Sequence, residues 1–231
     1  PSVDIQVHCK DARKLVAEIP ENTEYDAVFL DPFSPARSPE LYTNEFLSKL
    51  ANLLKNDGVI LTYTSAAPVR YALLNAGLEI GEGPVLGRSG GTIASPSRDR
   101  ITKPLKAADE RMVALSDAGI PYRDPDLNAL TEDILNNRHK ERMEVRGESK
   151  LASTVKTPVY LVSDMGYERQ KRRVLKHLQK FNINSLNDSK ARFLVCPQFP
   201  QCICHCHQER PATSRGRIKE MEKRMEIISH L

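Results

Sequence analysis

The run Asp31-Pro32-Phe33-Ser34 combines residue types that could position a nitrogen nucleophile. Proline stiffens a turn and removes a backbone donor, an aromatic ring can stack on a planar base, and a carboxylate can orient an amine and accept its proton. Methyl transfer to nitrogen requires this kind of orientation, because the lone pair must point at the carbon that it attacks. In a second interpretation, Asp31 only caps the turn that follows it.

Strands and helices that alternate along residues 1–97 must position these side chains. The pattern is typical of a parallel sheet with helices on its faces. Because ligands bind at the carboxyl ends of such strands, we expect Asp11, residues 31–35 and residues 62–65 to converge on one crevice. The predicted strands are Val3–Val7, Tyr25–Leu30 and Val59–Tyr63, with weaker extended stretches at Leu78–Gly81 and Gly90–Ala94. Helices are predicted from Asp11 to Ile19, from Glu40 to Lys55, and after Ser65 to a stop at Gly77.

The remainder of the chain divides into two further segments. Residues 98–150 are predicted to form a charged linker and helical tail, with a helix over Asp126–Gly147. Residues 151–231 are predicted to form a small, basic α/β extension that contains cysteines. Its expected elements are strands at Pro158–Val162 and Arg192–Val195, an amphipathic helix over Tyr167–Phe181, and a last helix with Ile218, Met221, Met225 and Ile228 along one face.

Three blocks of the first part resemble MnmC-type methyltransferases, the methyltransferase half of the enzyme that completes 5-methylaminomethyl-2-thiouridine at the tRNA wobble position. The resemblance covers roughly the first 140 residues. Its blocks are Phe29-Leu30-Asp31-Pro32-Phe33-Ser34-Pro35-Ala36-Arg37-Ser38-Pro39-Glu40-Leu41-Tyr42-Thr43, then Asn56-Asp57-Gly58, and Tyr63-Thr64-Ser65-Ala66-Ala67-Pro68-Val69-Arg70.

The resemblance implies a Rossmann-like class I methyltransferase sheet that uses S-adenosylmethionine to methylate the nitrogen of aminomethyl-uridine in tRNA. It also implies site residues. The residues implied for cofactor binding are Asp11, Asp31 and Pro32, and those implied for catalysis are Asp31 and Phe33. The residues implied for substrate binding are Thr64, Ser65, Arg70 and Arg88. No flavin is expected, because the chain lacks a dinucleotide-binding glycine fingerprint. The oxidase half of the family's enzyme would then be a separate partner.

The sequence departs from this family at its beginning. Family members start with a strand, a glycine-rich loop and a second strand that contact the cofactor, and no such elements precede Pro1. The strand at Val3–Val7 would then be the family's third. We therefore expect an N-terminally truncated fragment, with a sheet that is incomplete at the N-terminus and exposes apolar surface.

Four of the five cysteines lie close together near the end of the chain. Cys196, Cys202, Cys204 and Cys206 offer thiolates suited to zinc or an iron-sulfur cluster. The Cys-x-Cys-x-Cys spacing is unusual, because the chain would have to bend sharply for these neighbours to reach one metal. Reduced, partly buried cysteines without a metal are the alternative.

Charge is distributed unevenly along the chain. Residues 166–231 contain 14 basic and 6 acidic residues, whereas the whole chain has a net charge of +4. The basic end could contact the tRNA backbone or simply be solvated. Apolar runs are too short for a membrane span, so no membrane partner is expected, and the cysteine usage favours the cytoplasm. Two other functions stay open: a non-catalytic RNA-binding module, and an aminopropyltransferase-like enzyme of the same superfold.

Overall fold

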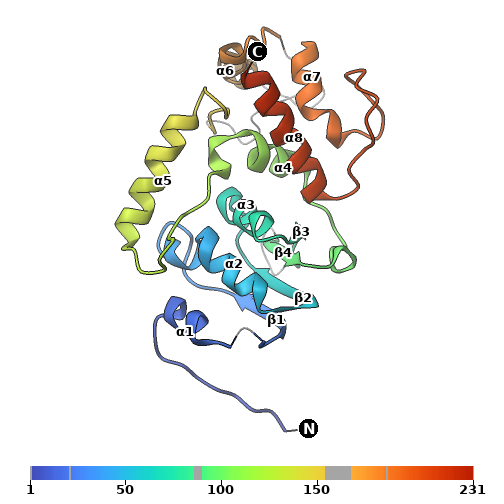
Figure 1. Cartoon of the computed structure of the whole chain (residues 1–231). Coiled ribbons are helices and arrows are strands. Elements are labelled where there is room, and N and C mark those ends of the chain that lie inside the picture. The colour runs from blue at the N-terminus through green and yellow to red at the C-terminus, as the bar shows by residue number, and fades with distance from the viewer. Residues whose placement is uncertain (1, 21, 86–89, 154–167, 186, 231) are drawn as a thin grey trace.

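The computed structural model describes residues 2–20, 22–85, 90–153, 168–185 and 187–230. A four-stranded sheet lies toward the end of the molecule that holds the N-terminus, and most of the helices encoded after residue 105 lie toward the other end (Figure 1). Among the described residues, no helix combines the length and the apolar character needed to cross a membrane.

The sheet is mixed, with the strand order β1-β2-β4-β3. Strand β1 (Tyr25–Leu30) pairs with β2 (Leu54–Thr62) in parallel, whereas β4 (Thr92–Ser95) is antiparallel to both β2 and β3 (Glu79–Glu82). All four strands overlap stretches predicted from the sequence. Because β1 and β2 are parallel, their carboxyl ends lie at the same edge of the sheet.

Three short helices follow the predicted order in this part of the chain. Helix α1 (Ala12–Glu18) begins after Asp11, whose side chain accepts a hydrogen bond from the backbone N–H of Arg13 at 2.9 Å. Helix α2 (Asn44–Asn52) is capped in the same way by Thr43. Helix α3 (Ala67–Asn75) ends before Gly77, which adopts φ = 92°, a conformation that glycine tolerates at a helix end.

The predicted strand at Val3–Val7 is wrong, because these residues form no strand in the structure. Val3, Ile5 and Val7 are 82%, 77% and 78% exposed. Among the described residues, β1 has a pairing partner only in β2, so no strand provides hydrogen bonds for this segment. An alternating sequence cannot form a stable strand alone in water.

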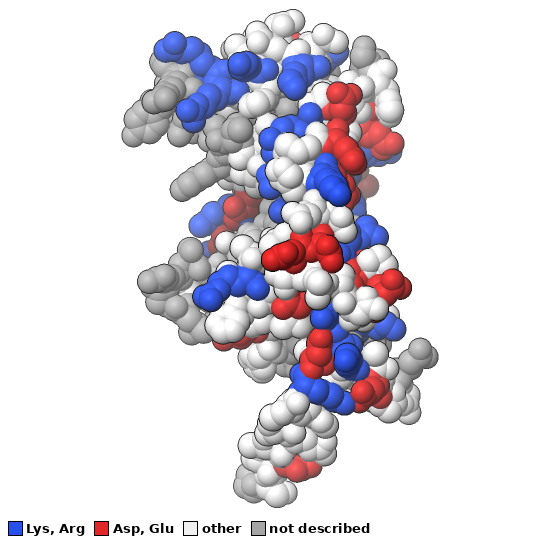
Figure 2. Space-filling view, turned by 90° about the vertical axis from the view of Figure 1, so that its left-hand side faces the viewer, with Lys and Arg blue, Asp and Glu red and all other residues white. Residues whose placement is uncertain are grey.

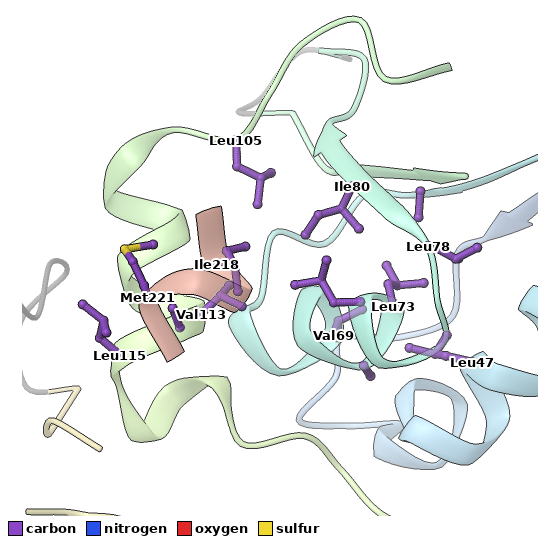
Figure 3. Close-up of a cluster of buried hydrophobic side chains, with 14 of the residues drawn as sticks. Leu47, Val69, Leu73, Leu78, Ile80, Leu105, Val113, Leu115, Ile218 and Met221 are labelled. Carbon is purple, nitrogen blue, oxygen red and sulfur yellow. The ribbon is translucent and has the colours of Figure 1, made fainter. Parts of the chain in front are cut away.

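Helices encoded far along the chain complete the core. Helix α4 (Ala107–Leu115) lies between α3 and the C-terminal helix α8 (Ser214–Ser229), and contacts both. Val113 and Leu115 of α4 meet Ile218 and Met221 of α8 in the cluster drawn in Figure 3. Residues from all three predicted segments therefore contribute to one hydrophobic cluster. The apolar stripe predicted for the last helix is confirmed by the burial of its four residues.

A buried ion pair adds a polar link between α4 and α8. Glu110 is 1% exposed, and its carboxylate accepts hydrogen bonds from the guanidinium of Arg217, the shortest at 2.6 Å. The side-chain amide of Gln198 donates to the same carboxylate at 2.8 Å. Several donors thus satisfy the buried charge, as its burial requires.

In the segment of residues 98–150, helix α5 (Thr131–Val145) begins later than predicted.

The described residues of the C-terminal extension form helices and loops and contain no strand, so the predicted α/β extension is wrong over those residues. Helix α6 (Glu168–Leu178) lies within the predicted helix. The strand predicted at Arg192–Val195 is wrong: these residues belong to α7 (Ser189–Val195), whose first turn is capped by Asp188. Leu194 and Val195 are buried by helix packing instead. The strand predicted at Pro158–Val162 lies outside the described residues.

Candidate functional site

The carboxyl edge of β1 and β2 brings two of the predicted motifs together. Leu30 pairs with Thr62, and each is the last residue of its strand. Asp31 and Tyr63 therefore leave the sheet from neighbouring positions. This register places the start of residues 31–35 beside residues 62–65, which is the convergence predicted for these two segments.

The turn after β1 is closed by its own backbone. The carbonyl of Ser34 accepts hydrogen bonds from the N–H groups of Arg37 at 2.7 Å and Ser38 at 3.0 Å. Phe33 is 70% exposed, and the Arg37 guanidinium lies 5.3 Å from the centre of its ring. Asp31 is exposed as well. The turn thus presents a carboxylate and an aromatic ring to solvent at the strand ends, as predicted from the residue types.

The turn after β2 is held by a buried polar chain. Thr92 of β4 donates its hydroxyl to the carbonyl of Thr64 at 2.8 Å, and that same hydroxyl accepts from Nε of Arg70 at 3.0 Å. Arg70 is 2% exposed and also pairs with Asp109, with 2.9 Å between Nη1 and the carboxylate. Arg70 therefore acts on the loop through Thr92 and Thr64. The next residue, Ser65, is exposed and available to a ligand.

Gly91 has a steric role beside this loop. A Cβ atom on Gly91 would lie 1.9 Å from the carbonyl oxygen of Thr62 and 2.6 Å from Cα of Tyr63. Only glycine permits this approach of the β4 backbone to the end of β2. The close approach places Thr92 where it can bond to Thr64.

Tyr42 is a candidate that the sequence reasoning did not assign to the site. It lies in the 3-10 turn Pro39–Tyr42 and is fully buried. Burial raises its pKa, and the neighbouring Tyr63 and Asp31 act in the same direction. The Tyr42 hydroxyl forms no hydrogen bond of acceptable geometry within the described part of the chain. A buried tyrosine hydroxyl at the end of β2, beside Tyr63 and Thr62, is a signal that only the folded chain provides.

Asp11 lies at the start of α1, where Arg13 holds it. Arg13 donates to the Asp11 carboxylate at 2.9 Å and lowers its pKa. The same guanidinium donates to Asp124 at 2.8 Å and to the carbonyl of Ala129 at 3.0 Å. Arg13 therefore joins α1 to the segment that precedes α5 through its bonds to Asp124 and Ala129. Asp11 remains exposed enough to receive a ligand.

The remaining predicted substrate residue, Arg88, lies outside the described residues. A separate hollow of about 750 Å³ is lined by residues of α3, α8 and the turn after α5, including Tyr71, Lys150 and Glu222. None of its lining residues is a predicted site residue.

The four C-terminal cysteines are gathered in a second location. The sulfur atoms of Cys196, Cys202, Cys204 and Cys206 lie within 4.8 Å of one another, and none forms a disulfide. The backbone N–H of His207 lowers the pKa of Cys202 to about 5, whereas burial raises the pKa of Cys204 to about 12. The structure thus brings together the cysteines that the sequence predicted as ligands.

Basic side chains gather at the end of the molecule where α6 lies, as the upper part of Figure 2 shows. Val174 and Leu178 of α6 are buried, whereas its basic residues Arg172, Arg173 and Lys176 are exposed. Lys180, in the 3-10 turn that follows α6, is exposed as well. Helix α6 thus packs on the protein with one face and presents positive charge on the other.

Comparison with known proteins adds independent information on the first part of the chain. Residues 1–96 match a family described as S-adenosyl-L-methionine-dependent methyltransferase. An uncharacterized protein of Methanocaldococcus jannaschii is 35% identical over 144 residues, which are 62% of this chain and 40% of that protein. The tRNA 5-methylaminomethyl-2-thiouridine biosynthesis bifunctional protein MnmC of Azoarcus sp. is 31% identical over 118 residues, 51% of this chain and 18% of that protein.

A solved structure agrees with these sequence relatives. The crystal structure of MNMC2 from Aquifex aeolicus matches with a TM-score of 0.54 and 34% identity. The match covers 58% of this chain and 44% of that chain. The chain therefore spans less than half the length of these relatives. The Rossmann-like methyltransferase sheet predicted from the sequence is confirmed by this neighbour together with the family match.

Proposed function

We propose that the protein methylates the nitrogen of an aminomethyl-uridine at the tRNA wobble position, because residues 1–96 match the S-adenosyl-L-methionine-dependent methyltransferase family and the chain is similar to MnmC. The observation that carries this proposal is the exposed Asp31-Pro32-Phe33 turn at the paired ends of β1 and β2. This is the edge at which open α/β sheets bind ligands.

The residues at this edge suit a methyl transfer to an amine. S-adenosylmethionine supplies an electrophilic methyl group on a positively charged sulfur. Asp31 would accept a hydrogen bond from the amine, direct its lone pair and receive its proton as the nitrogen–carbon bond forms. The sulfur–carbon bond would break in the same step, with S-adenosylhomocysteine as the leaving group. Phe33 would stack on the uracil ring, since its face is exposed. Thr64 and Ser65 would shape the substrate side of the crevice.

Other residues would hold the cofactor or the loops around it. Asp11 would contact the adenine, with Arg13 fixing its carboxylate. Arg70 is a positioning residue, because its buried guanidinium bonds to Thr92, whose hydroxyl in turn holds the carbonyl of Thr64.

A tRNA substrate is supported by the basic face of α6. Three exposed positive charges on α6, with Lys180 in the 3-10 turn that follows it, can contact backbone phosphates, which give affinity without reading sequence. The name of the MnmC relatives specifies a tRNA nucleoside, and this agrees with the positive charge of the C-terminal extension.

The reaction class is tested with the full-length protein and methyl-labelled S-adenosylmethionine. One reaction contains tRNA that carries unmethylated aminomethyl-uridine, and a parallel reaction contains putrescine with decarboxylated S-adenosylmethionine. We expect label in tRNA and no aminopropyl transfer. Formation of a polyamine would instead assign the protein to the aminopropyltransferases, and binding of tRNA without either reaction would indicate a non-catalytic RNA-binding module.

A further inference from the structure

The distances within the four-cysteine group match those around a single metal ion. The sulfur atoms of Cys196 and Cys202 are 4.0 Å apart, and those of Cys202 and Cys206 are 3.8 Å apart. A tetrahedral zinc ion with four thiolates at about 2.3 Å separates its sulfur atoms by about 3.8 Å. Two of the sulfur–sulfur distances thus agree with those around one tetrahedral ion, and all four sulfur atoms lie close enough together to surround it.

We propose that Cys196, Cys202, Cys204 and Cys206 bind one structural zinc ion. A disulfide would require two sulfur atoms at about 2.05 Å, far closer than any pair measured here. In a cubane iron-sulfur cluster each thiolate binds a different iron atom, which spreads the sulfur atoms farther apart than one central ion does. A mononuclear site therefore fits the geometry best.

The backbone bends where the short cysteine spacing requires it. His205, between Cys204 and Cys206, adopts φ = 61°, and His207 adopts φ = 50°. This left-handed conformation is unfavourable for residues other than glycine, so it persists only where the surroundings demand it. In an extended strand, a Cys-x-Cys-x-Cys run would be too long for its sulfur atoms to reach one ion. The left-handed conformation of the two histidines bends the backbone so that these sulfur atoms lie around one point. Both histidine side chains are exposed, so the ligand set is four sulfurs.

Backbone donors orient the sulfur atoms. The N–H of Ile203 points to the sulfur of Cys196, and the N–H of His207 points to that of Cys202, both at 3.4 Å. Hydrogen bonds of this kind orient metal ligands and stabilise thiolates. They form within the loop itself, so the ligand geometry is prepared by the backbone.

Two arginines supply the charge that such a site needs. Zinc with four thiolates has a net charge of −2, and Arg224 is 1% exposed beside it. The Arg224 guanidinium lies 3.4 Å from the sulfur of Cys206 and 3.7 Å from that of Cys204, while Arg210 lies 4.0 Å from Cys206. Burying a guanidinium is unfavourable without compensating negative charge. The thiolates would provide this negative charge for Arg224, in addition to the carboxylate of Glu220.

The position of the site indicates a structural role. Arg224 belongs to α8 and also donates to the carbonyl of Phe193 in α7 at 2.8 Å. The metal would thus tie the loop after α7 to the helix that packs on α4. Four thiolates occupy every position of a tetrahedral ion, so no position remains for a substrate.

Metal analysis of the purified full chain tests this proposal. We expect one zinc ion per chain, retained by a Cys9→Ser control because Cys9 is exposed outside the group. Cys204→Ser should lose most of the zinc. Replacement of zinc by cobalt(II) should give the intense visible bands and thiolate charge-transfer absorption typical of tetrahedral cobalt with four sulfur ligands.

If the Cys204→Ser variant does not fold, metal analysis and cobalt substitution of the wild-type protein test the proposal. Iron with acid-labile sulfide would overturn the zinc assignment in favour of a cluster. A folded, metal-free chain in which all five cysteines react with a thiol reagent, and which takes up no cobalt, would overturn the site itself. Cobalt spectra that lack thiolate charge-transfer bands would also contradict the proposed ligands.

Discussion

Leu30, the last residue of β1, pairs in parallel with Thr62, the last residue of β2. This register brings the turn at Asp31 next to the turn at Thr64, although 33 positions separate them in the sequence. Methyl transfer requires an acceptor amine and a methyl donor to meet in one place. In the proposed reaction, the paired strand ends would bring them together from two chain segments.

Replacing Asp31 by Asn should lower the rate of methyl transfer by about 100-fold or more, because the general base and the anionic acceptor are lost together. Binding of S-adenosylhomocysteine, measured by calorimetry, should change little. Asp26→Asn is the matched control: it lies at the other end of β1 and its side chain is 82% exposed. An equal loss of cofactor affinity in Asp31→Asn would show that Asp31 binds the cofactor instead of the amine.

Replacing Arg70 by Leu should lower the free energy of unfolding by about 2 to 3 kcal/mol, since the Thr92 hydroxyl and the Gly91 carbonyl lose a buried donor. Urea unfolding measures this change. Arg98→Leu, at an exposed arginine, should stay within about 0.5 kcal/mol of wild type. A small effect at Arg70 would mean that its contacts do not hold the loop.

The stability of the protein should fall in acid partly through Asp117. Burial opposes ionisation of Asp117, but hydrogen bonds from Arg146 and Ser153 and the charge of Arg142 outweigh it, so its pKa lies below the ordinary value of 3.8. Because the folded pKa is lowered, the stabilisation is complete above the unfolded pKa and is lost as the pH falls through 3.8 toward the folded value.

Asp117→Asn tests this origin of acid sensitivity. The variant should be less stable than wild type at pH 7, and the difference should shrink below about pH 4. Thermal unfolding at several pH values measures it. Asp133→Asn, exposed on α5, is the control and should change the stability at pH 7 by no more than about 0.5 kcal/mol. A difference that stays constant down to pH 3 would exclude a contribution from Asp117 ionisation.

If α6 contacts tRNA, Lys176→Glu should weaken binding several-fold and lower the magnitude of the salt-dependence slope by about one. Fluorescence anisotropy at a series of salt concentrations measures both quantities. Lys14→Glu changes an exposed lysine on α1, toward the other end of the molecule (Figure 1), and should have little effect. Equal effects of the two variants would assign the binding to overall charge and not to α6.

Local patterns predicted most elements near the site. The apolar run ending at Asp31, the cap at Asp11 and the glycine stop at Gly77 are all short-range signals, and each corresponds to an element of the structure. The helix predicted from Glu40 begins only at Asn44, after the Thr43 cap. The alternating residues Val3–Val7 also have a strand pattern. A strand requires a neighbour as well as a pattern, and the described residues provide none.

Other features depend on contacts that a pattern does not contain. The run Phe193-Leu194-Val195 suits a strand or a buried helical turn equally well, and the packing of α7 decides in favour of the helix. The burial of Arg70 against Thr92 and the unpaired hydroxyl of Tyr42 depend on residues distant in the sequence. Sequence reasoning identified the turns at Asp31 and Thr64, but not the contact of Arg70 with Thr92 that holds the turn at Thr64.

Nucleoside analysis of tRNA after reaction with methyl-labelled S-adenosylmethionine and the full-length protein tests the proposed activity most directly. The tRNA must carry aminomethyl-uridine at the wobble position, and matched tRNA without that modification serves as the control. We predict that label appears only on the aminomethyl nitrogen of the wobble uridine. Label on another nucleoside, or no transfer by a folded protein that binds S-adenosylhomocysteine, would contradict the proposed activity.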